Sequence, residues 1–357
     1  MIERQKKRVK IFAVSDIHGH KTKLEEVLDK AGFNKNSDEH MLIVLGDLFD
    51  RGGENRATFD YFNGINNKIL LRGNHEDILQ ETLTLGTVDL MQQINGTVGT
   101  LLDFFPSYSG GRYCSARNPK ERKISDELKR LINSMPVYFE SDNYVFTHGW
   151  LPVYNCKIKP DWRYSGSGKW RAARWERWNR YYGITEIPFE KNLVVGHTSA
   201  SYGSDFDNTR SSECYDIFYG DKMIAIDGLT VMSGVVNCFV TEDDITLPVT
   251  FNAPIDNKAL TSINQGKTRV YLTLADEASL DIRPLDSIVF HSPDGRTAKT
   301  MVISLHKYSS VLDISEDFTD EELGLSDGET LADVVRRYYS FDDVADYGFL
   351  AVVIRAN

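Results

Sequence analysis

Short apolar runs recur along the first two thirds of the chain, and most of them end in a polar motif that contains glycine. Each run has the length of a strand, and helix-length stretches separate them. This alternation predicts an α/β fold. In the first intervening stretch, apolar residues recur at helical spacing and Gly32 stands where a helix would end. The predicted strands are 9–14, 41–45, 68–71, 144–147, 192–195 and 223–226.

Five polar motifs carry the candidate chemistry of the chain. Four of them stand at or just after the C-terminal end of a predicted strand, which is where open α/β sheets bind their ligands. In chain order the motifs are Asp16-Ile17-His18-Gly19, Gly46-Asp47-Leu48-Phe49-Asp50-Arg51-Gly52, Gly73-Asn74-His75-Glu76, His148-Gly149 and Gly196-His197.

The residue types in these motifs favour a metal centre. Carboxylate oxygens and imidazole nitrogens together suit divalent first-row metals, and the glycines let the backbone turn sharply at the strand ends. Two cations about 3.5–4 Å apart can share one carboxylate, activate a water and hold phosphoryl oxygens. A single aspartate or histidine at a strand end is more often a turn residue, but five such motifs in order favour a two-metal site that hydrolyses phosphate esters.

The ordered motifs resemble those of the phosphoprotein phosphatase branch of the calcineurin-like metallophosphoesterases, including its bacterial and phage members. The resemblance covers residues 9–240. It implies a four-layer sandwich, in which two sheets are flanked by helices. It also implies that a hydroxide bridging two metal ions attacks the phosphorus atom. In the family pattern, the metal ligands correspond to Asp16, His18, Asp47, Asn74, His148 and His197, with Asp47 as the bridge.

The resemblance also assigns roles around the metals. His75 would protonate the leaving-group oxygen, with Asp50 orienting its ring, and Arg51 would clamp the phosphoryl oxygens. Arg174 resembles a second phosphate-binding arginine, although Arg171 and Arg177 are close enough in the sequence to take its place. Asp227 resembles an aspartate that supports the metal ligands without binding metal.

Two further features of the first 240 residues affect the prediction. Related bacterial proteins often continue after Gly-His with a further histidine, whereas this chain continues with Thr198, so substrate contacts are expected to differ. The polar stretch 104–123 lacks periodicity and is interpreted as a long loop.

A second domain is expected after a change of pattern near residue 242. Residues 243–255 read as a linker, and 256–357 as alternating strands with one late acidic helical segment, which together predict a small β-barrel. This part resembles an ASCH domain of the PUA-like superfamily. That resemblance implies RNA binding, but Tyr271 and Thr273 stand where the family has polar groove residues, so protein contact or regulation is an equal alternative.

The bulk composition limits the location and the partners of the chain. A formal net charge of −11 gives no general attraction to nucleic acid or anionic membranes, and no apolar run reaches the length of a membrane span. The four cysteines form no C-x-x-C pair. We therefore expect a cytoplasmic protein without a membrane partner.

The functional hypothesis is a phosphomonoesterase with two divalent ions. Manganese is expected first, and iron, zinc and nickel are compatible with the same ligands. The expected substrate is a phosphoprotein, which would make the chain a Ser/Thr protein phosphatase. The alternatives are a dinucleoside polyphosphate hydrolase, an RNA-end phosphatase, and an RNA-binding or scaffold module with an incidental hydrolase site.

Overall fold

The computed structural model describes residues 2–108, 118–326 and 328–356. Its chain forms two compact units. The larger unit contains Lys7–Ile158 and Arg171–Ile245, and the C-terminal unit contains Met1–Lys6, Lys159–Trp170 and Thr246–Asn357. This division differs from the boundaries predicted at residues 242 and 255, because the segments Met1–Lys6 and Lys159–Trp170 also belong to the C-terminal unit.

The first sheet of the larger unit has the strand order β11-β1-β2-β3. Strands β1, β2 and β3 are parallel, with Val14 beside Val44 and Val44 beside Leu70. Their apolar residues are buried, as expected of parallel strands. The strands are β1 (Lys6–Val14), β2 (His40–Val44), β3 (Lys68–Leu70) and β11 (Phe239–Thr246).

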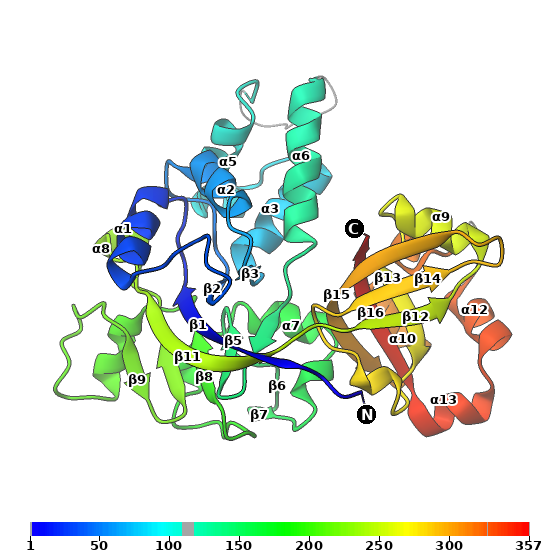
Figure 1. The fold of residues 1–357 in the computed structure, drawn as a ribbon. Helices are drawn as coiled ribbons and strands as arrows, with labels where there is room; N and C mark the ends of the chain where they lie inside the picture. The colour runs from blue at the N-terminus through cyan, green and yellow to red at the C-terminus, as the bar shows by residue number, and fades with distance from the viewer. Residues whose placement is uncertain (1, 109–117, 327, 357) are drawn as a thin grey trace. The chain divides into compact units, whose positions relative to one another are not determined.

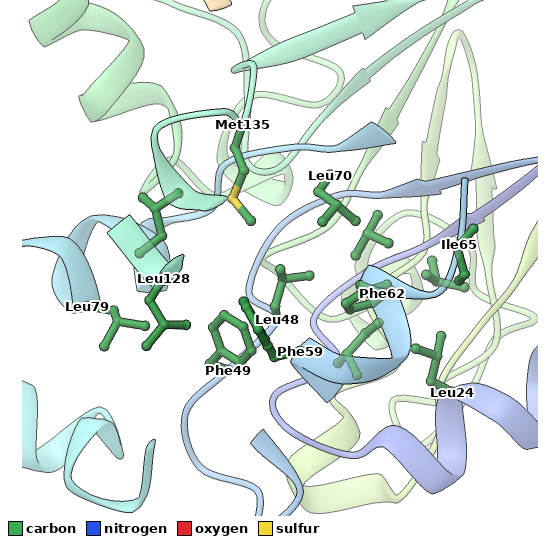
Figure 2. Close-up of a cluster of buried hydrophobic side chains, with 14 of the residues drawn as sticks. Leu24, Leu48, Phe49, Phe59, Phe62, Ile65, Leu70, Leu79, Leu128 and Met135 are labelled. Atoms are coloured by element: carbon green, nitrogen blue, oxygen red, sulfur yellow. The ribbon is translucent and has the colours of Figure 1, made fainter. Parts of the chain in front are cut away.

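Helices pack their apolar faces with this sheet into a continuous core (Figure 2). Helix α1 ends at Gly32 in a left-handed conformation, which confirms the predicted helix end. The helices that contribute to this core are α1 (Lys21–Ala31), α2 (Asn55–Asn63), α3 (Asn74–Leu85), α5 (Thr97–Phe104) and α6 (Pro119–Ile132), whereas the apolar side chains of the short helix α4 (Leu90–Ile94) are exposed.

The loop predicted at 104–123 is wrong at its C-terminal end. Helix α6 already begins at Pro119, because the Asn118 side chain caps its first turn and proline fits the first helical position. Residues 109–117 of that prediction lie outside the described residues.

The second sheet of the larger unit has the order β4-β5-β8-β10-β9. Its three central strands are parallel, and β4 and β9 pair antiparallel at the edges. All six predicted strands are therefore present, and the unit is a mixed α/β fold consistent with the predicted sandwich. The strands are β4 (Tyr138–Glu140), β5 (Tyr144–Thr147), β8 (Asn192–Val195), β9 (Phe218–Gly220) and β10 (Met223–Ala225). The unit also has a hairpin of β6 (Val153–Tyr154) and β7 (Lys157–Ile158) and the helix α8 (Thr230–Ser233), and the division between the units falls within α7 (Ser167–Ala173).

The C-terminal unit is built on one five-stranded sheet of order β12-β14-β15-β16-β13 (Figure 1). This open sheet is compatible with a half-barrel. The prediction of a single late helix is wrong, since five α-helices lie in the described part after residue 246. The elements are β12 (Thr250–Pro254), α9 (Asn257–Asn264), β13 (Val270–Leu274), β14 (Ser287–His291), β15 (Thr297–Tyr308), α10 (Val311–Asp317), α11 (Asp320–Leu323), α12 (Leu331–Tyr338), α13 (Phe341–Tyr347) and β16 (Phe349–Ala356).

Specific contacts explain why distant segments join this unit. The guanidinium of Arg4 binds Asp286 through two hydrogen bonds of 2.8 and 2.7 Å. The backbone carbonyl of Ser165 lies 2.7 Å from Nδ1 of His306, and Thr250–Pro254, expected in the linker, forms strand β12 beside β14.

Among the residues that the structure describes, no helix is long and apolar enough to cross a bilayer.

Candidate metal centre

The six predicted metal ligands come from the C-terminal ends of parallel strands in the larger unit. Parallel strands present these ends at one edge of a sheet, so residues far apart in the sequence can converge there. Asp16 and His18 follow β1, Asp47 follows β2, Asn74 follows β3, His148 follows β5, and His197 follows β8. Five of the six are buried, and His197 is half-buried.

Several of the site residues have a left-handed backbone. A positive φ is uncommon for residues other than glycine and costs about 1–3 kcal/mol where the surroundings must hold it. Such strain clusters at functional sites, and here more than half of the non-glycine residues with positive φ in the described chain belong to the predicted set. They are Asp16 (51°), His18 (46°), Asp47 (55°), Asp50 (71°), Arg51 (66°) and His197 (60°).

Two motif glycines are required by close approach. A Cβ atom on Gly73 would lie 2.2 Å from Oδ1 of Asp47, and one on Gly196 would lie 1.8 Å from Oγ of Ser15. Any larger residue at either position would displace the loops that carry Asp16 and Asp47.

Asp47 lies at the centre of the histidine cluster. Its Oδ2 lies 3.7 Å from Nε2 of His18 and 3.8 Å from Nε2 of His75, and its Oδ1 lies 3.4 Å from Nε2 of His148. Two groups of potential ligand atoms share this carboxylate, namely His18–Asp47–His75 and Asp47–His148–His197. A carboxylate common to two groups is the arrangement expected of a bridging ligand.

The histidines are held in the form that binds metal. His18 and His148 direct Nδ1 to the backbone carbonyls of Phe49 (2.9 Å) and Leu45 (2.5 Å). Each Nδ1 therefore carries the proton and leaves the Nε2 lone pair facing the site. Burial lowers the pKa of His148 to about 4 and that of His197 to about 3, which keeps both rings neutral at ordinary pH.

The negative charges of the buried carboxylates are destabilised in the absence of cations. Burial, and next to it the charge of Asp16, raises the pKa values of Asp47 and Asp227 well above the ordinary range, and burial raises that of Asp16 to about 6. Divalent cations would neutralise these charges. Carboxylates, imidazole lone pairs and the Asn74 carbonyl thus fit a pair of divalent ions, and Asp227 is buried close enough to Asp16 to interact with its charge.

His75 and Asp50 form the predicted pair. Nδ1 of His75 lies 2.7 Å from Oδ2 of Asp50, and both side chains are buried. Burial lowers the pKa of His75 to about 2 and raises that of Asp50 to about 7, because an isolated charge on either group is disfavoured there.

The predicted arginines differ in their surroundings. Arg51 is exposed, but its Nη1 lies 3.1 Å from Nε2 of His18, and its charge lowers the pKa of Asp16. Arg174 is buried, and it binds Oδ2 of Asp77 through Nε at 2.8 Å and Nη2 at 2.7 Å. Arg177 is close enough to His197 to lower the pKa of that ring.

Arg171 and Arg177 are exposed, and the contacts with Asp77 belong to Arg174. Asp77 also accepts a 2.6 Å bond from Nε of Arg72, so the structure places Arg174 in an ion-pair network beside the site. That network was not expected from the sequence.

Sequence reasoning also missed four residues that hold the site together. Glu76 accepts backbone hydrogen bonds from Asp47 (2.9 Å), Leu48 (2.9 Å) and Gly73 (2.8 Å), and its place in the Gly-Asn-His-Glu motif was the available signal. The other three lie outside the motifs, where no pattern marks them, and they are Asp77, Thr97 and Thr100.

A buried cluster of this kind on a mixed α/β unit defines a metal-dependent phosphoesterase. The chain belongs to the calcineurin-like phosphoesterases, because the model of that family matches residues 9–226, which is more than half of the chain. It is therefore a hydrolase of the phosphatase class. No curated protein matches the chain.

Several solved structures are similar to parts of the chain. A metallophosphoesterase from Sphaerobacter thermophilus is 17% identical over 62% of this chain and 76% of its own, with a TM-score of 0.34. A candidate diadenosine tetraphosphatase is 15% identical over 67% and 93%, with a TM-score of 0.42. A protein serine/threonine phosphatase from Saccharomyces cerevisiae is 24% identical over 40% and 39%, with a TM-score of 0.28.

Proposed function

We propose that the larger unit hydrolyses phosphomonoesters, with phosphoserine and phosphothreonine in proteins as its substrates and two divalent ions, manganese first, as its cofactors. The observation that carries this proposal is the buried contact of 2.7 Å between His75 and Asp50 beside the Asp47 cluster. Such a pair can protonate an alcohol leaving group, which serine and threonine esters need.

The chain offers two sets of ligands for the ions. Asp16 and His18 would hold the first, and Asp47 would join both. The second ion would be held by Asn74, His148 and His197. When bound, such ions polarise phosphoryl oxygens and make water more acidic.

The chain's own groups would then orient the substrate and move one proton. The exposed guanidinium of Arg51, 3.1 Å from His18, would bind two phosphoryl oxygens at once. The pair of His75 and Asp50 is neutral overall when one proton lies between Nδ1 and Oδ2 and another lies on Nε2, so burial opposes that state less than it opposes an isolated charge on either group. The proton on Nε2 is the one that His75 would give to the leaving oxygen.

Arg174 is proposed as the second arginine that binds phosphate. Its side chain is buried, and the carboxylate of Asp77 fixes its orientation. A guanidinium fixed in this way loses less conformational entropy when it binds an anion.

For the C-terminal unit we propose that its sheet binds RNA or protein, with neither partner favoured. The ring of Tyr271 packs against Phe290 at 5.0 Å, so its side chain serves the core of the unit and not a polar groove. Fluorescence anisotropy of labelled RNA with the full chain would detect RNA binding. If RNA binds tightly and the metal-loaded protein hydrolyses no phosphate ester, the module with an incidental hydrolase site replaces the phosphatase proposal.

The test is a substrate series with metal-stripped protein after addition of Mn²⁺. The four substrates are an aryl phosphate, a phosphoserine peptide, diadenosine tetraphosphate and RNA with a 5′-triphosphate. We expect turnover of the first two that Asp47→Asn abolishes and His291→Ala, in the C-terminal unit, leaves intact. A kcat/KM at least about ten times higher on either nucleotide substrate would overturn the protein-phosphatase proposal, because 1.4 kcal/mol of transition-state binding separates substrates by that factor.

A further inference from the structure

Two threonines of α5 bind the carboxylate that orients His75. Oγ1 of Thr100 lies 2.6 Å from Oδ1 of Asp50, and Oγ1 of Thr97 lies 3.2 Å from Oδ2. The same Oδ2 accepts the 2.7 Å bond from Nδ1 of His75. The carboxylate is completely buried, so these side chains, and not water, determine its rotation.

Thr100 also holds the backbone of Asp50. The backbone N–H of Asp50 donates to Oγ1 of Thr100 at 3.0 Å, while the hydroxyl donates to the carboxylate of the same residue. This closes a small ring around a residue whose φ is 71°. A hydroxyl that accepts one bond and donates another has a fixed orientation, and it fixes both groups that it contacts.

The helix that carries the threonines is itself packed against the site. A Cβ on Gly96, directly before α5, would lie 2.5 Å from the backbone nitrogen of Arg51, and Phe104 at the other end packs edge-on against Phe49 at 5.6 Å. Helix α5 therefore contacts the Asp50–Arg51 turn directly and cannot shift without moving it.

The hydroxyls of these threonines serve a purpose other than the usual one in a helix. A buried helical threonine commonly bonds the carbonyl of the preceding turn, as Thr82 of α3 does with Ile78 at 2.9 Å. Thr100 directs its hydroxyl out of α5 to Asp50 instead, and Thr97, the first residue of the helix, also bonds Asp50.

We infer that Thr97 and Thr100 are positioning residues that act through Asp50 to aim Nε2 of His75 at the leaving-group oxygen. This inference rests on the proposed phosphomonoesterase function and goes beyond it by assigning α5 a part in leaving-group protonation. The effect of these residues must then depend on how much the leaving group needs a proton. An alkoxide leaving group needs it, whereas a nitrophenolate does not.

The test compares Thr100→Val with wild type on phosphoserine peptide and on p-nitrophenyl phosphate. Valine keeps the shape of threonine and removes the hydroxyl. We expect kcat on the peptide to fall about ten times more than kcat on the aryl ester, as a fraction of the 10²–10⁴-fold that a general acid contributes, with little change in KM. Thr100→Ser should restore the wild-type ratio, and Thr97→Val, which loses the longer bond, should give a smaller change of the same sign.

Two controls separate positioning from structural damage. Thr82→Val removes an equally buried helical hydroxyl and should leave the ratio of the two activities at the wild-type value. In a His75→Asn background, Thr100→Val should cause no further loss on the peptide, because residues that act through one group are not additive.

Equal losses of the Thr100→Val and Thr97→Val variants on both substrates, or no loss at all, would overturn the inference while the proposed function stands. If Thr100→Val does not fold, Thr97→Val decides by the same ratio. Wild-type protein that hydrolyses neither substrate would instead show that the proposed function itself fails.

Discussion

Nε2 of His148 lies 2.8 Å from Oδ1 of Asn74, and both atoms are acceptors. The Nδ1 proton of His148 is engaged with the carbonyl of Leu45, so no hydrogen lies between the two residues. Two buried lone pairs at this distance repel each other unless a cation binds them both.

We predict that His148→Ala lowers the number of bound Mn²⁺ ions from about two to about one per chain, because loss of even a hydrogen-bond partner of a metal ligand typically costs about 10–100-fold in metal affinity. Metal content after gel filtration measures this number. His291→Ala is the matched control and should keep both ions. Two ions retained by His148→Ala would remove His148 from the set of ligands.

Removal of metal should destabilise the protein. Asp16, Asp47 and Asp227 are buried, and the charge of Asp16 raises the pKa values of the other two, so their mutual repulsion is relieved when cations bind. Each bound ion, at about 100 times its Kd, would add about 2.7 kcal/mol to the free energy of unfolding. Thermal melts with and without EDTA measure the difference, and an unchanged Tm would contradict the assignment of a metal centre.

Changes to the His75–Asp50 pair should reduce turnover without loss of metal. We expect His75→Asn to lower kcat on a phosphoserine peptide by about 10²-fold or more, the usual contribution of a general acid. Asp50→Asn should act in the same direction, since the amide cannot stabilise a charged ring. Kinetics and metal content are measured on the same samples, and loss of both ions from His75→Asn would show that His75 is a ligand.

The Asp77 network should contribute to stability in a pH-dependent way. Burial would raise the pKa of Asp77, but Arg174 and Arg72 together outweigh burial and lower it below 3.8. A lowered folded-state pKa means that the contribution is present above the unfolded value and is lost as pH falls through the folded value. Asp77→Asn should therefore lower the free energy of unfolding at pH 7, by about 3 kcal/mol, because it leaves a buried arginine without its partner.

Urea unfolding at several pH values measures this contribution. The difference between wild type and Asp77→Asn should be constant near neutrality and shrink as pH falls below 3.8. Asp60→Asn is the control, since that exposed carboxylate pairs with Arg56 at the surface and should change stability little. A difference between Asp77→Asn and wild type that persists unchanged in acid would contradict the ion-pair explanation.

The sequence by itself determined the parts of the molecule that depend on local patterns. Apolar runs of strand length were enough to predict all six parallel strands of the larger unit, because burial on both faces of a parallel sheet leaves a continuous apolar signal. The motifs at the ends of these strands indicated a phosphoesterase, because their carboxylate and imidazole groups suit divalent metals and their order resembles that of the calcineurin-like family. This resemblance predicted the family to which the chain belongs.

Only the tertiary structure decided what supports those motifs. Thr97 and Thr100 reach Asp50 across about fifty positions, with separations of 47 and 50 residues, and Asp77 meets Arg174 across 97. No sequence period marks such contacts, because they depend on how helices pack onto the sheet. The same reason applies to Arg4 near the N-terminus. Its hydrogen bond to Asp286 spans 282 residues and holds the first residues of the chain in the C-terminal unit.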